Sequence, residues 1–107
     1  MYVIGILMDP IESVDFKTDS SISIINTLQK KARIKLILPD TVFSESSYVY
    51  AKVSDFHIDS LNKRKYKLSN KKIINLNQLD CIFFRKDPPV DNHYLTLVQI
   101  IKELEFQ

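Results

Sequence analysis

The first forty residues hold two short apolar runs on either side of an amphipathic segment, and this order most constrains the fold. The run at residues 2–8 is continuously apolar, which is typical of a parallel strand buried on both faces, and residues 33–38 form a second run, rich in Ile and Leu, that closes at Pro39. Between them, apolar residues recur at helical spacing, which predicts a helix at about residues 20–32 with Asp19 as its N-cap. Strand, helix and strand in this order predict a right-handed βαβ unit.

A third apolar run, at residues 79–84, breaks abruptly into the charged segment Arg85-Lys86-Asp87-Pro88-Pro89. Proline fixes φ and lacks an amide donor, so this segment should leave the strand as a stiff, extended corner. In open α/β sheets, ligands bind outside the carboxyl ends of the strands. We therefore expect a binding site at this corner.

The other segments predict an antiparallel excursion and a final helix. Residues 41–43 and 48–53 flank a polar turn, which is typical of a hairpin at the edge of a sheet. Residues 65–68 and 72–76 are short strands or turns, and an apolar stripe predicts a helix at about residues 92–105. The expected fold is α/β, with a small, mostly parallel sheet flanked by helices and extended by an antiparallel hairpin.

Composition limits the class of protein. A chain of 107 residues that is 45% hydrophobic and 26% charged fits one globular domain, and its first apolar run lacks the basic region of a signal peptide. We expect no membrane span and a cytoplasmic location. The net charge of +2 comes from scattered lysines and favours a solvated surface over nucleic-acid binding. The cluster Lys63-Arg64-Lys65 beside Tyr66 leaves RNA contact as an alternative.

The scarce residue types exclude several kinds of site. Gly5 is the only glycine, so the chain contains no Gly-rich phosphate loop. Cys81 is the only cysteine, which excludes an internal disulfide and a multi-cysteine metal site. Its place in an apolar run predicts a buried, small hydrophobic residue. His57 and His93 have no partner at metal-ligand spacing and fit surface positions better.

Parallel strands would bring two polar corners to one edge of the sheet, beside the N-terminus of the first helix. The candidate binding residues gathered there are Asp9, Pro10, Lys17, Asp19, Ser20, Ser21, Arg85, Lys86 and Asp87. Arg85 could hold a carboxylate, and Asp9 or Asp87 could pair with an ammonium, as an amino-acid-like zwitterion requires. The residues alone leave open the alternative that these side chains only cap turns and form surface ion pairs.

Three segments of the chain carry a family likeness: Met8-Asp9-Pro10-Ile11, Lys17 with Asp19-Ser20-Ser21, and Phe84-Arg85-Lys86-Asp87-Pro88-Pro89 with Asp91. They resemble the N-terminal domain of bacterial glutathione synthetases, over essentially the whole chain. The resemblance implies one Rossmann-like domain, residues 1–107, of the kind that precedes an ATP-grasp unit. In that family an oligomeric enzyme ligates γ-glutamylcysteine to glycine with ATP and magnesium, through an acyl phosphate. The resemblance further implies that Asp9, Lys17, Ser20, Ser21 and Arg85 line the γ-glutamylcysteine side.

The sequence departs from the family in its loops and in its extent. Lys31-Ala32-Arg33 stands where family members usually have a glycine after the first helix, and Thr18 separates Lys17 from Asp19. Nothing in the chain corresponds to the nucleotide cleft or metal carboxylates of the ATP-grasp unit. We therefore expect no catalytic residue, metal or cofactor in this chain, and we expect it to need an ATP-grasp partner or a full-length synthetase to make glutathione.

Two other functions remain open from the sequence. The chain could be a truncated, non-catalytic remnant that acts only as an oligomerisation or binding module, through its final helix and a sheet edge. A receiver-like signalling domain is suggested by Asp9 and Lys86 at two strand ends. A receiver also needs an acidic residue at a third strand end, and Pro39 with the following hairpin crowds Asp40, the residue available there.

Overall fold

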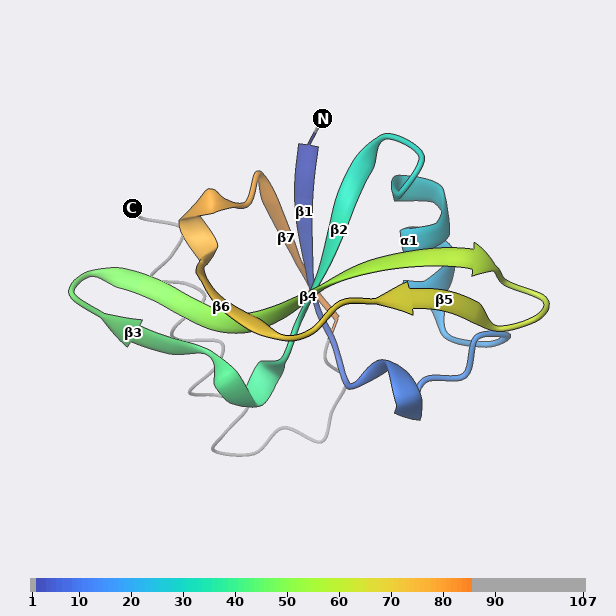
Figure 1. Cartoon of the computed structure of the whole chain (residues 1–107), viewed down its shortest axis with the longest axis horizontal. Coiled ribbons are helices and arrows are strands. Elements are labelled where there is room, and N and C mark those ends of the chain that lie inside the picture. The colour runs from blue at the N-terminus through green and yellow to red at the C-terminus, as the bar shows by residue number, and fades with distance from the viewer. Residues whose placement is uncertain (1, 86–107) are drawn as a thin grey trace.

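The computed structural model describes residues 2–85, which form a seven-stranded mixed sheet with a helix packed on one face (Figure 1). The helix and strands are β1 (Tyr2–Leu7), α1 (Ser20–Leu28), β2 (Ala32–Ile37), β3 (Phe43–Glu45), β4 (Tyr48–Ser60), β5 (Lys65–Leu68), β6 (Lys72–Asn75) and β7 (Cys81–Phe84). Short 3-10 turns precede α1 and follow β2 and β6. The helix expected at residues 92–105 lies outside the described residues.

The three predicted parallel strands are confirmed. β1 lies between β2 and β7 and is parallel to both, with Leu7 opposite Ile37 on one side and Phe84 on the other. Because the last residues of β2 and β7 both pair with the last residue of β1, the carboxyl ends of all three strands meet at the same edge of the sheet (Figure 1). The binding site expected from the sequence belongs at this edge.

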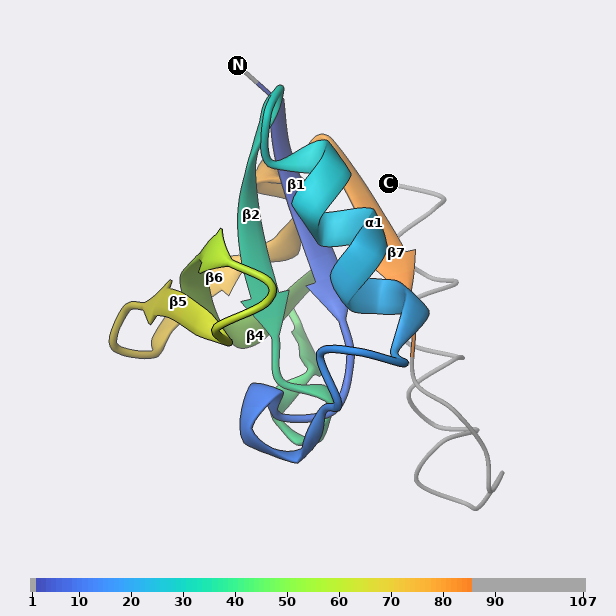
Figure 2. The same cartoon turned by 90° about the vertical axis from the view of Figure 1, so that its right-hand side faces the viewer.

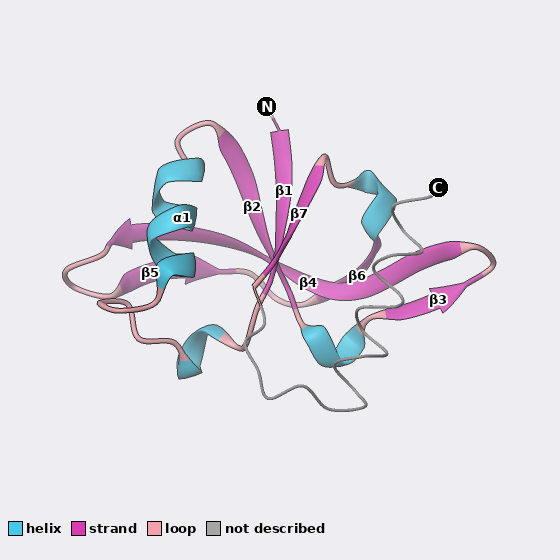
Figure 3. Cartoon of the chain, turned by 180° about the vertical axis from the view of Figure 1, so that it is seen from behind, coloured by secondary structure: helices cyan, strands magenta, loops and turns pink. Residues whose placement is uncertain are grey.

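The prediction of a mostly parallel sheet is wrong, because β4 is far longer than the hairpin strand expected from the sequence. β4 has 13 residues and pairs antiparallel with β2, β3, β5 and β6. The expected hairpin is present as β3 and β4. The two segments predicted as short strands or turns, at residues 65–68 and 72–76, form the strands β5 and β6. β4 is therefore a second organising strand inside the sheet, and Figure 3 shows it crossing behind the three parallel strands.

Two apolar clusters cover opposite faces of β4. Its first half buries Val49, Ala51 and Val53 in a cluster with Leu7 and Ile37. Its second half buries Phe56 and Ile58 in the cluster that α1 joins through Ile22 and Ile25. Since neighbouring residues of a strand point to opposite faces, the odd-numbered positions face one cluster and the even-numbered positions face the other. Figure 2 shows α1 in front of the three parallel strands, on the side of this second cluster.

The helix ends four residues earlier than predicted. α1 stops at Leu28, and Ala32, expected as its last apolar contact, instead begins β2 and is 5% exposed. We attribute this early end to Gln29, the C-cap residue, because its side chain forms hydrogen bonds with the backbone of β4. Gln29 Nε2 donates to the carbonyl of Ile58, and the amide of Ile58 donates to Gln29 Oε1, each at 2.8 Å.

The burial predicted for Cys81 is also wrong. Cys81 is exposed and free, while Ile82 and Phe84 of the same strand pack partly buried against the cluster of Leu7 and Ile37. β7 ends the described strand order, so it has a strand neighbour on one side only within residues 2–85. An edge strand buries alternate side chains, and Cys81 lies on the other face from Ile82.

Candidate functional site

Arg85 joins the ends of two parallel strands. It follows β7 directly, and its backbone amide donates to the carbonyl of Leu7, the last residue of β1, at 2.7 Å. This bond continues the β1 and β7 ladder by one residue and places Arg85 beside Met8 and Asp9. The carboxyl edge of the sheet therefore carries a guanidinium group at a position set by backbone pairing.

The N-terminus of α1 has the cap that the sequence predicts. Asp19 has extended backbone angles, and its carboxylate accepts a hydrogen bond from the amide of Ser21 at 2.7 Å. Ser20 and Ser21 are the first two helical residues, and Ser21 is buried at 4% exposure. A capped N-terminus presents the positive end of the helix dipole to this side of the sheet.

The guanidinium group of Arg85 ties the strand end to the helix start. Arg85 Nε donates to Ser21 Oγ at 3.2 Å, and Arg85 Nη2 donates to Ser20 Oγ. Arg85 is half-buried, so these contacts hold its side chain in one orientation. A guanidinium has five N–H donors, and these two bonds leave others for a bound group.

The loop before α1 closes the site from a third side. Asp15 Oδ1 accepts from the amide of Lys17 at 2.8 Å, and the Asp15 carbonyl accepts from the amide of Asp19 at 2.9 Å. The hydrogen bond from the Lys17 amide holds the pKa of the Asp15 carboxyl below its ordinary value. Asp15 is therefore ionised, and it shapes the turn that leads into the helix cap.

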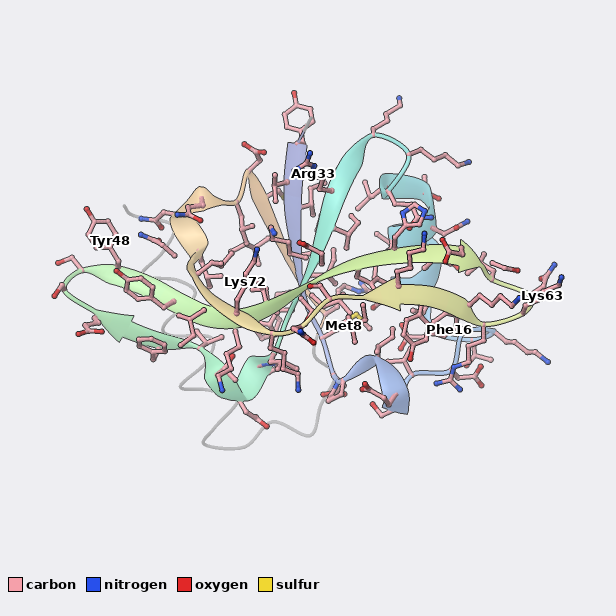
Figure 4. The ribbon with its side chains drawn as sticks, in the orientation of Figure 1. Met8, Phe16, Arg33, Tyr48, Lys63 and Lys72 are labelled. Carbon is pink, nitrogen blue, oxygen red and sulfur yellow. The ribbon has the colours of Figure 1, made fainter. Side chains whose placement is uncertain are left out.

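Phe16 anchors this loop to β5 and to the turn between β4 and β5. Its ring is 9% exposed and lies 5.6 Å from that of Tyr66 between centroids, and Arg64 stacks over it at 5.3 Å. Arg64 Nη2 also donates to the carbonyl of Glu12 at 3.2 Å. Figure 4 shows Phe16 beneath β5. The turn between β4 and β5 thus supports the loop that carries Asp15.

These parts enclose a cavity of about 430 Å³, which we call the polar cavity. Its lining residues are Met8, Asp9, Ser13, Val14, Asp15, Thr18, Asp19, Ser20, Ser21 and Arg85. Among these side chains are three carboxylates and one guanidinium, so the described lining carries two net negative charges at neutral pH. A ligand with an ammonium group and a carboxylate complements such a lining, because the aspartates attract the first and Arg85 attracts the second.

The structure brings together five of the nine residues proposed from the sequence. Asp9, Asp19, Ser20, Ser21 and Arg85 line the polar cavity. Pro10 lies at the adjoining cleft of about 300 Å³, beside Pro39 and Lys71. Lys17 is exposed, and its side chain is not part of the described cavity lining. Lys86 and Asp87 lie outside the described residues.

Three polar lining residues were not among those proposed from the sequence. Ser13, Asp15 and Thr18 come from the polar segment between β1 and α1. An aspartate two residues before an amide that it can bind is a turn signal, and it could have placed Asp15 in the site wall. Ser13 and Thr18 carry no such signal, because their positions depend on the path of the whole loop.

Two further features bear on function. Within residues 2–85, no group of three or more His, Cys, Asp or Glu side chains is arranged to hold a metal ion. No helix in the same part of the chain has the length and apolar character needed to cross a membrane.

The fold and this site define an α/β domain with a polar ligand cavity at the carboxyl ends of its parallel strands. Comparison with known proteins gives the family: the family model for the prokaryotic glutathione synthetase N-terminal domain matches residues 2–107. The chain therefore belongs to the family of prokaryotic glutathione synthetase N-terminal domains.

Individual relatives agree with the family match. The chain is 36% identical over 106 residues to glutathione synthetase of Wigglesworthia glossinidia brevipalpis, covering 98% of this chain and 34% of that protein. It is 30% identical over 103 residues to the enzyme of Buchnera aphidicola subsp. Baizongia pistaciae, covering 95% and 32%. For Vibrio cholerae the identity is 29% over 106 residues, covering 98% and 33%. The chain spans about a third of the length of these curated relatives.

Proposed function

We propose that this domain binds γ-glutamylcysteine for the ATP-dependent ligation that makes glutathione. One observation carries the proposal: the Arg85 guanidinium is fixed by Ser20 and Ser21 at the wall of a cavity that also contains three aspartates. The family match supports a role in glutathione biosynthesis, and the cavity supports the choice of substrate.

The glutamyl end of γ-glutamylcysteine is a zwitterion, with a free α-carboxylate and a free α-ammonium group. The proposed pose places the carboxylate on the remaining N–H donors of Arg85, close to the N-terminus of α1. The ammonium group then faces Asp9 and Asp15 across the cavity. Both charges of the ligand meet opposite charges, which compensates for the loss of water around them.

The bond-forming chemistry belongs to a separate ATP-grasp unit in this proposal. That unit supplies ATP and magnesium and activates the carboxylate that glycine attacks. In the chain itself, Gly5 is the only glycine, so no Gly-rich loop can cover a nucleotide. We propose that the domain works in the cytoplasm, within an oligomer, by presenting γ-glutamylcysteine to the ATP-grasp unit.

A ligase assay tests this function. The chain is combined with an ATP-grasp segment from a relative, and ADP release is measured with γ-glutamylcysteine and glycine. Arg85→Ala and Asp9→Ala should each raise the KM for γ-glutamylcysteine by about tenfold or more, since each removes a charged contact. Lys31→Ala, at an exposed position in the turn that follows α1, serves as the control. Unchanged kinetics in Arg85→Ala and Asp9→Ala would contradict the assignment.

A second candidate function is an assembly module without catalysis, and an exposed apolar surface favours it. Tyr48 and Ile73 are 46% and 56% exposed, on the strands β4 and β6. Phe43 and Tyr50 stack at 5.4 Å between ring centroids on the same hairpin. Sedimentation of the chain against Ile73→Lys tests this reading: an association that the variant abolishes supports it, and a monomeric wild-type chain contradicts it.

A further inference from the structure

A second cavity, of about 730 Å³, lies over β2, β4 and β5 and shares no lining residue with the polar cavity. We call it the basic groove and define it by Arg33, Lys35, Asp55, Phe56, Lys67 and Lys72. Its volume is within the range of about 300 to 1,000 Å³ typical of small-molecule sites. The proposed function makes no use of it.

Strand register places the charged residues of the groove on one face of the sheet. Lys35 of β2 lies opposite Asp55 of β4, and His57 of β4 lies opposite Lys67 of β5. Residues two apart on a strand share a face, so Arg33 joins Lys35 on this side. Lys72 enters from β6, where it pairs with Val53 of β4. Figure 4 shows Arg33 on β2 and Lys72 on β6.

Within the described residues, this face is the exposed continuation of an apolar cluster. Ile37 and Val53 lie on the same face and are buried with Leu7. Beyond Val53, β4 is covered on its opposite face instead, so Asp55 and His57 are left exposed. The groove thus forms where β4 changes the face that it buries.

The groove carries a concentrated positive charge. Four cationic side chains line it, and Asp55 is its only carboxylate among the described residues. Lys35 Nζ already lies 2.6 Å from Asp55 Oδ1, which leaves three net positive charges at neutral pH. The polar cavity has the opposite sign, so the modest net charge of the chain conceals two separate regions of opposite charge.

The described lining of the groove offers no exposed Phe, Tyr or Trp side chain. Ile34 and Phe56 also border the groove, but their side chains, 3% and 4% exposed, are buried on the opposite face of the sheet against α1. A buried aromatic ring cannot stack on an unpaired base, which disfavours single-stranded nucleic acid as the ligand. The cations line one groove from three strands instead of forming an extended stripe, which disfavours a long polyanion. Lysine ammonium groups bind phosphate oxygens well as point charges.

We propose that the basic groove binds a small molecule that carries several phosphate groups. Lys67, Lys72 and Arg33 contact the phosphate oxygens, while Lys35 stays with Asp55. The groove is a binding site separate from the polar cavity, so it can be occupied with or without γ-glutamylcysteine. This inference does not depend on the proposed ligase function.

Titration calorimetry of the full chain with inorganic tripolyphosphate tests the proposal. The variant Lys67→Gln/Lys72→Gln removes two groove cations. The control Lys30→Gln/Lys63→Gln removes the same charge from two exposed positions outside the groove lining. Near physiological salt, where distant surface charges are screened, we expect the groove variant to weaken binding by about tenfold or more and the control to change it by less than about twofold.

Titrations with further ligands show which kind of molecule carries the phosphate groups that bind. Equal affinity for ATP and tripolyphosphate supports recognition of phosphate groups alone, and tighter binding of ATP supports an additional contact with the nucleoside. The proposal is overturned if both double variants weaken binding equally, if the wild-type chain does not bind tripolyphosphate, or if a hexaglutamate peptide or a single-stranded RNA binds more tightly than either phosphate ligand.

Discussion

Arg85 and Ser21 lie 64 positions apart in sequence, and Arg85 Nε donates to Ser21 Oγ at 3.2 Å. This contact joins the end of β7 to the start of α1. It exists because Arg85 continues the backbone ladder beside β1 and because the Asp19 cap fixes where the helix begins. The wall of the polar cavity is therefore produced by two independent local structures that meet at one side-chain bond.

Asp19 caps α1 and lines the polar cavity, and a pair of variants separates its effect on stability from the effect of its charge on ligand binding. Asp19→Ala removes the N-cap and should lower the free energy of unfolding by about 1 kcal/mol, while Asp19→Asn caps nearly as well and should retain stability. Asn lacks the negative charge, so it should still weaken binding of an ammonium-bearing ligand. Urea unfolding and ligand titration measure the two effects. If both variants lose the same stability, the cap is not the stabilising contact.

Gly5 is required by close packing against β1. A Cβ at this position would lie 2.6 Å from Leu79 Cδ1 and 2.8 Å from Ile37 Cδ1. Gly5→Ala should therefore lower the free energy of unfolding by about 1 to 3 kcal/mol, because both neighbours must shift in a packed cluster. The double variant Gly5→Ala/Leu79→Ala relieves the shorter contact. Denaturant unfolding should show less than additive loss in the double variant; strict additivity would show that Leu79 is not the obstruction.

The lowered pKa of Asp55 predicts a specific change in the free energy of unfolding with pH. The hydrogen bond from Lys35 is the main cause that lowers its pKa below the ordinary value of 3.8. Because the pKa of Asp55 is lowered in the folded state, ionised Asp55 contributes fully to the free energy of unfolding above its unfolded-state pKa. This contribution is lost as the pH falls through the folded-state pKa. Asp55→Asn should therefore reduce stability at neutral pH by no more than about 1 kcal/mol, because the pair is partly exposed.

Urea midpoints from pH 2 to pH 7 check this prediction. The wild-type chain and Asp55→Asn should differ near neutral pH and converge at the acid end of the range. Lys35→Met provides the matched control, because it removes the partner that lowers the Asp55 pKa. A constant difference between wild type and Asp55→Asn at every pH would contradict the role assigned to the ion pair.

The parallel core of the fold was predictable from the sequence because its signals are local. β1, β2 and β7 are apolar runs that end in polar or proline residues, and Asp19 is a strong cap before an apolar periodicity. The parallel pairing of the first two strands follows from the helical connection between them. These local signals are sufficient to predict the carboxyl edge of the sheet as the place of the site.

The length of β4 could not be predicted from the sequence, because the buried positions change from one face of the strand to the other. Val49, Ala51 and Val53 are buried on one face, and Phe56 and Ile58 are buried on the other. A strand that is half covered on each face shows a break in alternation near Val53 and Ser54, and this break reads as the end of a strand. The antiparallel part of the sheet was underestimated for this reason.

The end of α1 was misplaced by a coincidence of spacing. Ala32 continues the helical period of Ile22, Ile25 and Leu28, yet it belongs to β2. The deciding contact is the pair of hydrogen bonds between Gln29 and Ile58, which are 29 positions apart. Tertiary contacts of this kind leave no signal in a local window of sequence.

The proposed function depends above all on Arg85 holding the carboxylate of γ-glutamylcysteine in the polar cavity. NMR titration of the ¹⁵N-labelled chain tests this contact directly, with Arg85→Ala as the variant and Arg33→Ala, in the basic groove, as the control for loss of one arginine. We expect γ-glutamylcysteine to shift the amide signals of Asp19 and Ser21 in the wild-type chain and in Arg33→Ala. Arg85→Ala should bind about tenfold more weakly or worse. Equal affinity in Arg85→Ala and wild type, or no shift at α1 in the wild-type chain, would contradict this binding mode.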